Sequence, residues 1–214
     1  NGFASTGPEQ GDVNMRNGST ISAEDGAITL QGSGHVNLSI VNADSNTDGT
    51  SGTVIIIADY EGVGNGLADN EGAITDNLAA ETPNITALNV AFRAGDGVGT
   101  DADNINTASL TGQTLTIAVE TESGDVNILN VGSLTVGTVD ALSGVTITDA
   151  DTDDTGNDNI TLIASSPLTV NQSITNADGG DITLTATDDG GADDLTISAA
   201  VTATGGNGAI DLNA

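Results

Sequence analysis

This sequence has no cysteine, no lysine and no tryptophan, and it contains only two arginines, one tyrosine and two phenylalanines. Aromatic side chains supply large blocks of buried area in an ordinary globular core. Any core formed here must therefore consist of Val, Ile, Leu and Ala. The absence of cysteine excludes disulfides, but it fits both a reducing compartment and surface proteins that do not use them, so it decides little about location.

Basic residues are outnumbered by 31 acidic ones, and the formal net charge is -29. Nucleic-acid binding depends on Lys and Arg that neutralise phosphates, so we expect no nucleic-acid partner. The longest wholly apolar run, residues 54–58, is far shorter than the roughly 20 residues of a membrane span, so we expect no membrane insertion. The first residues, "NGFASTGPEQ", contain no basic signal-peptide region, which fits a processed protein or a segment of a larger one.

Few aromatics and a high net charge are also typical of disordered chains. Here, however, 36% of the residues are hydrophobic, and Val, Ile and Leu alternate with Thr and other polar residues. That period of two indicates half-buried β-strands. The one segment with helical character, residues 65–81, is weakened by its glycines and asparagines. The sequence therefore predicts an all-β protein with many short strands.

A repeated pattern runs through the second half of the chain. Each copy begins with Leu-Thr followed by Ile or Val, continues through a turn of Gly, Asn and Asp, and ends on a second short apolar alternation. Copies begin at Leu115, Leu134, Leu168 and Leu195, which are 19, 34 and 27 residues apart. Repeats of this length indicate stacked units that bury their apolar faces against their neighbours.

Because each unit holds strands and no helix, we predict a β-solenoid in which rungs pair in parallel. One rung would point Leu115, Ile117, Val126 and Ile128 inward, and Thr would occupy solvated positions. We expect residues 1–20 to be a leading segment or cap and residues 21–214 to form the solenoid, most regularly over 110–214. The alternative all-β interpretation is a β-sandwich, whose strands follow one another at 8 to 12 residues.

The segments "GDITLTA", "GNGAIDLNA", "LTVNQSITNADGG" and "GAITLQGSG" resemble the haemagglutinin-type repeats of filamentous-haemagglutinin-like exoproteins and giant repeat adhesins. The resemblance is good over residues 110–214 and weak before them. It implies a right-handed parallel β-helix in a secreted, fibrous protein of adhesion, biofilm or cell-surface structure, located outside the cell. The resemblance implies no catalytic residue. The scarcity of Lys and aromatics departs from the family and points to a saline or calcium-rich setting.

Two acidic turns match the first half of a calcium-binding EF-hand loop, D-x-[DN]-x-[DN]-G. In both turns the twelfth position, which should be Glu, is apolar: it is Ile55 in one and Leu162 in the other. Divalent cations would also relieve the self-repulsion of a folded body with this charge. We therefore predict calcium as a ligand. The candidate ligands are Asp44, Asn46 and Asp48 in the first turn, and Asp151, Asp153 and Thr155 in the second.

Catalysis is not expected. Many β-helices are polysaccharide lyases, but lyase chemistry needs cationic groups and this chain has two Arg and one His. Carboxylate pairs could serve a glycosidase, yet there is no Trp to form a platform for sugar rings. His35 is expected to be a turn residue. Threonines at alternate positions are the arrangement found in ice-binding solenoids, although the uneven repeat lengths argue against a regular threonine face.

The sequence thus predicts a structural component of an extracellular fibre, adhesin or sheath, whose partners are copies of itself or further repeats of the same polypeptide. A strand-donating β-sandwich filament subunit and a carbohydrate- or ice-binding module are the alternatives, and glycans are possible partners. The last residues, "GAIDLNA", lie within the repeat pattern. We therefore expect the strand around Ile210 and Leu212 to contact further chain or another subunit.

Overall fold

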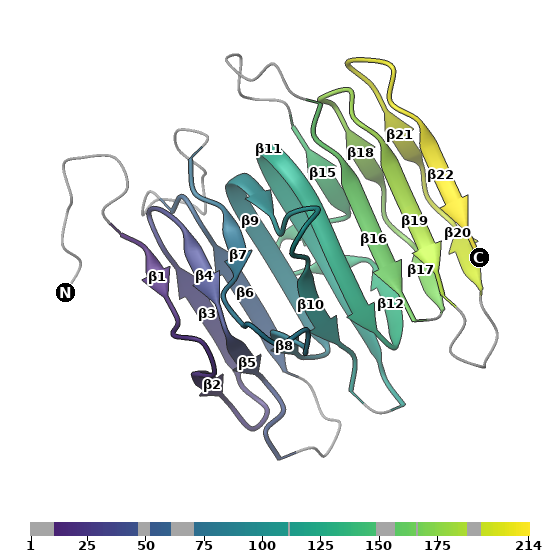
Figure 1. Cartoon of the computed structure of the whole chain (residues 1–214). Helices are drawn as coiled ribbons and strands as arrows, with labels where there is room; N and C mark the ends of the chain where they lie inside the picture. The colour runs from purple at the N-terminus through teal and green to yellow at the C-terminus, as the bar shows by residue number, and fades with distance from the viewer. Residues whose placement is uncertain are drawn as a thin grey trace.

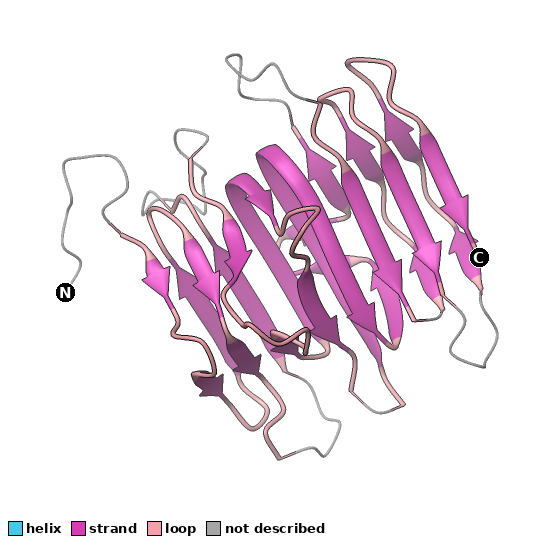
Figure 2. Cartoon of the chain, viewed as in Figure 1, coloured by secondary structure: helices cyan, strands magenta, loops and turns pink. Residues whose placement is uncertain are grey.

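The alternating apolar segments form short strands that wind through successive rungs, and each strand pairs in parallel with its equivalent in the next rung (Figures 1 and 2). This computed structural model describes residues 11–46, 52–60, 71–110, 112–148, 157–165, 167–187 and 194–214. Within these residues twenty strands form one large sheet, which is not closed, and two more form a small hairpin. No helix long and apolar enough to span a membrane occurs among them.

The strands fall into four stacks, each made of strands that pair across successive rungs. Stack 1 contains β1 (Val13–Asn14), β4 (Val36–Leu38), β7 (Ile74–Asp76), the end of β9 (Asn89–Val98), part of β11 (Thr114–Val131), β16 (Ile160–Ala164), β19 (Ile182–Ala186) and β22 (Ile210–Asn213). Stack 2 contains β2 (Thr20–Ser22), β5 (Ile40–Asn42), β8 (Ile85–Thr86), β10 (Ile105–Ala108) and the end of β11.

The other two stacks lie on the opposite side of the core. Stack 3 contains β3 (Ala27–Gln31), β6 (Thr53–Ile57), the first part of β9 and of β11, β12 (Ser133–Val136), β17 (Leu168–Val170) and β20 (Leu195–Ile197). Stack 4 continues from the middle of β11 into β15 (Val145–Ile147), β18 (Ile174–Asn176) and β21 (Val201–Ala203). Strand β1 and strand β22 lie at opposite ends of the molecule (Figure 1).

The core consists of aliphatic ladders that run from rung to rung. The stack 1 ladder is Val13, Val36, Ile74, Val98, Val126, Ile160, Ile182 and Ile210. The stack 3 ladder is Ile28, Val54, Val90, Ile117, Val136, Val170 and Ile197. The stack 4 ladder is Leu30, Ile56, Phe92, Val119, Val145, Ile174 and Val201. Each fully buried Val, Leu or Ile contributes about 1.5–3 kcal/mol.

The predicted alternation is confirmed. Leu115, Ile117, Val126 and Ile128 are all fully buried, and all four belong to β11. In β19 the inward residues are likewise buried, whereas the threonines between them are partly exposed. The parallel pairing also decides against the β-sandwich interpretation, because among the named strands of the described residues only β13 and β14 pair antiparallel.

Glycines permit close stacking of the turns between stack 4 and stack 1. A Cβ atom on Gly180 would lie 1.9 Å from the carbonyl oxygen of Asp158 in the rung before it. Gly205 has a positive φ of 93°, and its Cβ would lie 2.0 Å from the carbonyl oxygen of Ala177. No other residue fits these two positions without a shift of the backbone. This explains the glycine-rich turn that recurs in the repeat.

One insertion interrupts the regular rungs. Between β12 and β15 the chain forms an antiparallel hairpin of β13 (Thr138–Val139) and β14 (Leu142–Ser143). Val139 and Leu142 pack on Ala91 and Ala118, which are outward residues of β9 and β11. The hairpin therefore covers the solenoid surface on the N-terminal side of its own rung.

The predicted boundary at residue 20 is not marked by a change in pairing. Strand β1 already pairs with β4, so the described stacking begins at Val13. The first ten residues lie outside the described ranges. Whether they form a cap stays a prediction.

Candidate functional site

The first predicted calcium turn follows β5 and stacks on the turn that follows β2. Asp44 is 2% exposed, and its backbone N–H donates to Asn42 Oδ1 at 2.9 Å. Asn46 is exposed, and its Nδ2 donates to Asp25 Oδ1 at 3.2 Å. Asp25 belongs to the neighbouring rung. It precedes Asn46 by 21 residues, so no local motif could indicate this contact. The structure thus places Asn46 beside Asp25. Asn46 is exposed whereas Asp44 is buried, so the two predicted ligands do not share one environment.

The other predicted ligands, Asp48, Asp151, Asp153 and Thr155, lie outside the described residues. Among the residues that are described, no group of three or more His, Cys, Asp or Glu side chains has the arrangement needed to hold a metal ion. The calcium site therefore stays a prediction, with the turn at residues 44–46 as its described part.

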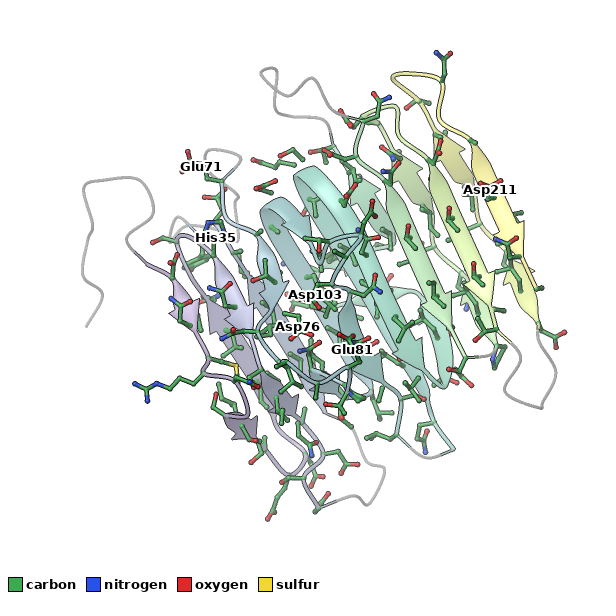
Figure 3. The ribbon with its side chains drawn as sticks, viewed as in Figure 1. His35, Glu71, Asp76, Glu81, Asp103 and Asp211 are labelled. Carbon is green, nitrogen blue, oxygen red and sulfur yellow. The ribbon has the colours of Figure 1, made fainter. Side chains whose placement is uncertain are left out.

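A second group of carboxylates comes from loops between stacks 1 and 2 (Figure 3). It consists of Asp76 at the end of β7, Glu81 in the following loop, and Asp103 in the loop before β10. Two amides bind this group: Asn84 Nδ2 donates to Asp76 Oδ1 at 2.6 Å, and Asn106 Nδ2 donates to Glu81 Oε2 at 3.2 Å. We refer to Asp76, Glu81 and Asp103 as the acidic cluster.

Burial, and then the negative charges of Asp76 and Glu81, raise the pKa of Asp103 above its ordinary value. The cluster was missed in the sequence because its members come from different loops at no motif spacing. One signal was present in the sequence, because Asp76 occupies a position at which the alternation predicts an apolar residue. In the structure it pairs with Leu38. Chemically, the cluster offers carboxylate oxygens and no cationic partner among these contacts.

A ladder of polar side chains precedes the stack 1 strands in the C-terminal half. The N–H of Asn159 donates to Asp125 Oδ1 at 2.7 Å, and the N–H of Asp181 donates to Asn159 Oδ1 at 2.9 Å. The N–H of Ala209 then donates to Asp181 Oδ1 at 2.7 Å. Each side chain satisfies a backbone donor of the next rung, where one rung must turn into its next strand. These residues hold the turns in register.

His35 belongs to the same kind of ladder at the N-terminal end. Its N–H donates to Asp12 Oδ1 at 2.9 Å, and its Nδ1 accepts from the N–H of Ala73 at 3.0 Å. It lies just before β4, which confirms that it is a turn residue. The ring nitrogen that accepts from the backbone has a structural role. The prediction that the chain is not an enzyme stays a prediction.

Arg93, one of the two arginines of the chain, is buried beneath the hairpin. Its Nε lies 3.3 Å from Glu120 Oε2, and its Nη1 lies 4.0 Å from Asp140 Oδ2 at the hairpin tip. Glu120 is the residue of β11 that pairs with Arg93 across the rungs. The ion pairs therefore join two rungs and the hairpin, and they supplement its apolar contacts.

Comparison with protein-family models, with curated proteins and with solved structures gave no match.

Proposed function

We propose that this chain is a structural segment of an extracellular surface fibre, adhesin or sheath. It assembles by stacking rungs end to end, associates laterally, and is stabilised by divalent cations. The proposal is supported by the fold, in which length is built by repetition, and by the resemblance to haemagglutinin-type repeats noted above. A solenoid of this kind presents a long surface that grows with the number of rungs.

The observation that carries the proposal is the continuity of the ladders, which run in register through the described rungs, so that length is gained by adding rungs. Ile197, Ile210 and Leu212 are 39%, 41% and 52% exposed. The residues with which they pair in the rung before, Val170, Ile182 and Leu184, are fully buried. Strands with unpaired N–H and C=O groups beside exposed aliphatic side chains form a template for another strand. A further rung, from another copy or from the same polypeptide, would bury these side chains.

The opposite end offers strands in the matching order. Among the described residues, β1, β2 and β3 have a pairing partner only on their C-terminal side. Stacking β22 on β1 and β20 on β3 of the next copy would continue the stack 1 and stack 3 ladders. The new ladder neighbours would be Ile210 with Val13 and Ile197 with Ile28, which are aliphatic on both sides.

Divalent cations enter the proposal through the charge of the chain. A net charge of -29 opposes both folding and the approach of a second copy. Among the described residues, acidic side chains occur in turns that stack on one another, as do Asp25 and the 44–46 turn. Oxygen-rich turns of this type suit calcium, which takes six to eight oxygen ligands.

The test is immunogold electron microscopy of the native source with antibodies raised against the purified chain. The proposal predicts gold particles along filaments or a sheath outside the cell. Label confined to the cell interior would contradict it. Pre-absorption of the antibody with purified chain provides the control for specificity.

A carbohydrate- or ice-binding module is the second candidate, because one observation favours it. Thr116, Thr135, Thr169 and Thr196 stand in register across four rungs of stack 3. The uneven repeat lengths argue against such a column, but the described strands stay in register in spite of them. A thermal-hysteresis assay and pull-down with insoluble polysaccharide test this candidate.

A further inference from the structure

The outward surface of stacks 3 and 4 differs in charge from the rest of the C-terminal half. It is formed by β12, β15, β17, β18, β20 and β21, and we refer to it as the threonine face. Residues 133–139, 141–148, 167–177 and 195–208 contain no Asp, Glu, Arg or His. In a chain with 31 acidic residues, this is an extended uncharged surface.

Two columns of threonines run along this face in register. The first is the stack 3 column that ends at Thr196, and the second is Thr146, Thr175 and Thr202 in stack 4. All are partly or fully exposed. Both columns lie on the same side of the sheet. The first column pairs with Thr116 of β11 and the second with Glu120 of β11, and both of these residues point outward from that one strand. Successive threonines in a column repeat at the rung spacing of about 4.8 Å.

Among the residues that the structure describes in this half, acidic side chains lie beside this face or on other surfaces. Asp158, Asp178 and Asp181 lie in the turns between stack 4 and stack 1, and Asp211 lies on the outward side of β22 in stack 1. On the N-terminal side the face ends at the hairpin, whose tip carries Asp140. Two copies that approach each other through any of these surfaces bring like charges together. The threonine face avoids that repulsion.

We propose that the threonine face binds the threonine face of a second copy of this chain, giving lateral pairs of solenoids; this rests on the proposed fibre function. The partner must be uncharged where it makes contact, and its features must repeat at the rung spacing. A second copy meets both conditions, because its threonine methyl and hydroxyl groups have the same repeat. Facing columns can then interdigitate as the side chains of paired sheets do in a steric zipper.

The size of the face matches a weak interface. Three rungs at about 4.8 Å, and about ten residues of strand and turn at about 3.3 Å, give on the order of 500 Å² for each copy. Two copies would bury on the order of 1,000 Å², which is at the lower limit for a specific pair. Such contacts gain strength when many of them act along one fibre. Added salt should strengthen the pairing by screening the acidic borders.

The test uses the absence of cysteine in the chain. Thr135→Cys, Thr169→Cys and Thr175→Cys place single thiols on the threonine face, and Thr161→Cys and Thr183→Cys place them on stack 1 as matched controls of similar exposure. After mild oxidation, non-reducing electrophoresis should show a several-fold greater fraction of disulfide-linked dimer for at least one of the first three than for either control. The fraction should rise with sodium chloride. Equal cross-linking on both faces, or none on the threonine face, would overturn the proposal.

End-to-end stacking is separated from lateral pairing by repeating the experiment with Leu212→Asp added. Lateral cross-linking should persist in that background. If elongated assemblies form while the threonine-face thiols stay unlinked, the lateral proposal is wrong and the fibre function stands. If the uncross-linked chain instead binds insoluble polysaccharide or ice, and Thr169→Asp abolishes that binding, the face has a different partner and the proposal is also overturned.

Discussion

The N-terminal rungs, which contain β1 to β8 and β10, and the C-terminal rungs, from β12 to β22, share one inward register but differ in what occupies it. In the C-terminal rungs the stack 1 positions are Ile160, Ile182 and Ile210. Two residues further along each strand is the next inward position, which is Leu in the later rungs. In the N-terminal rungs Asp76 occupies this position and pairs with Leu38. There, loops carrying Asn84 and Glu81 bind the polar groups. At this inward position the polar side chain is accommodated because a loop supplies hydrogen-bond partners.

The two regions also differ in how they use insertions. In the C-terminal half the strands on either side of the extra residues pair in register, so the ladders continue unbroken. In the N-terminal half one insertion lies between Val98 and Ile105. Val98 pairs with Val126 of β11 and Ile105 pairs with Ile128, and these two partners are only two residues apart. That loop carries Asp103 of the acidic cluster. The insertion between Val98 and Ile105 thus contributes to the acidic cluster, whereas the described C-terminal ladders keep a regular register.

The largest expected effect comes from placing a charge in a C-terminal ladder at Leu184, whose partners in the neighbouring rungs are Leu162 and Leu212. Leu184→Asp should lower the free energy of unfolding by at least about 3 kcal/mol, because it buries an unpaired carboxylate. The outward neighbour Thr183→Asp should change it by about 0.5 kcal/mol or less. Urea denaturation followed by circular dichroism measures both. Equal losses would contradict the assigned alternation.

Removal of calcium should have the next largest effect. If the acidic turns bind calcium, a concentration 100-fold above the dissociation constant adds about 2.7 kcal/mol of stability. Excess EDTA should then lower the melting temperature by about 5–10 °C relative to calcium-loaded protein. High sodium chloride should give a smaller stabilisation that does not saturate, since it acts by screening alone. Identical melting curves with EDTA and with millimolar calcium would exclude the cation site.

A pair of glycine substitutions compares the packing of turns in the two regions. Gly18 and Gly205 both have positive φ, but a Cβ on Gly18 meets nothing within 4 Å, whereas one on Gly205 meets the carbonyl oxygen of Ala177. Gly18→Ala should cost about 1 kcal/mol for its backbone conformation. Gly205→Ala should cost more, about 2–3 kcal/mol, because the stacked turn must also shift. Thermal denaturation measures the difference, and equal costs would mean that the turns do not stack as closely as described.

The smallest effect concerns the acidic cluster. A pKa of Asp103 raised in the folded state means that the folded chain takes up the proton at higher pH than the unfolded chain does. The resulting contribution to stability is present below the unfolded pKa and is lost as pH rises through the folded pKa. Asp103→Asn should therefore slightly raise the melting temperature at pH 7 and have no such benefit at pH 3. A decrease at pH 7 would indicate that the Asp103 carboxylate has a stabilising partner.

The sequence predicts the C-terminal half better than the N-terminal half, for physical reasons. Ladder residues such as Leu115 and Ile182 are recognisable because a period of two and a recurring turn define them locally. The hairpin that contains Val139 and Leu142 was missed. In the sequence these two residues could equally well belong to a regular strand of the repeat. Asp103 and Arg93 meet their charged neighbours from other rungs, at separations set by loop lengths that no local pattern encodes. The same holds for Asp25, which meets Asn46 across two stacked turns.

X-ray diffraction from oriented assemblies of the purified chain tests the central claim, that rungs stack end to end along a fibre, most directly. The account predicts a strong reflection near 4.8 Å along the long axis of the assembly, because the strands run across that axis. The Leu212→Asp variant should form shorter assemblies with a weaker reflection, and Thr183→Asp should match the unmodified chain. A 4.8 Å reflection perpendicular to the long axis, or a chain that stays as single particles at every concentration, would contradict the account.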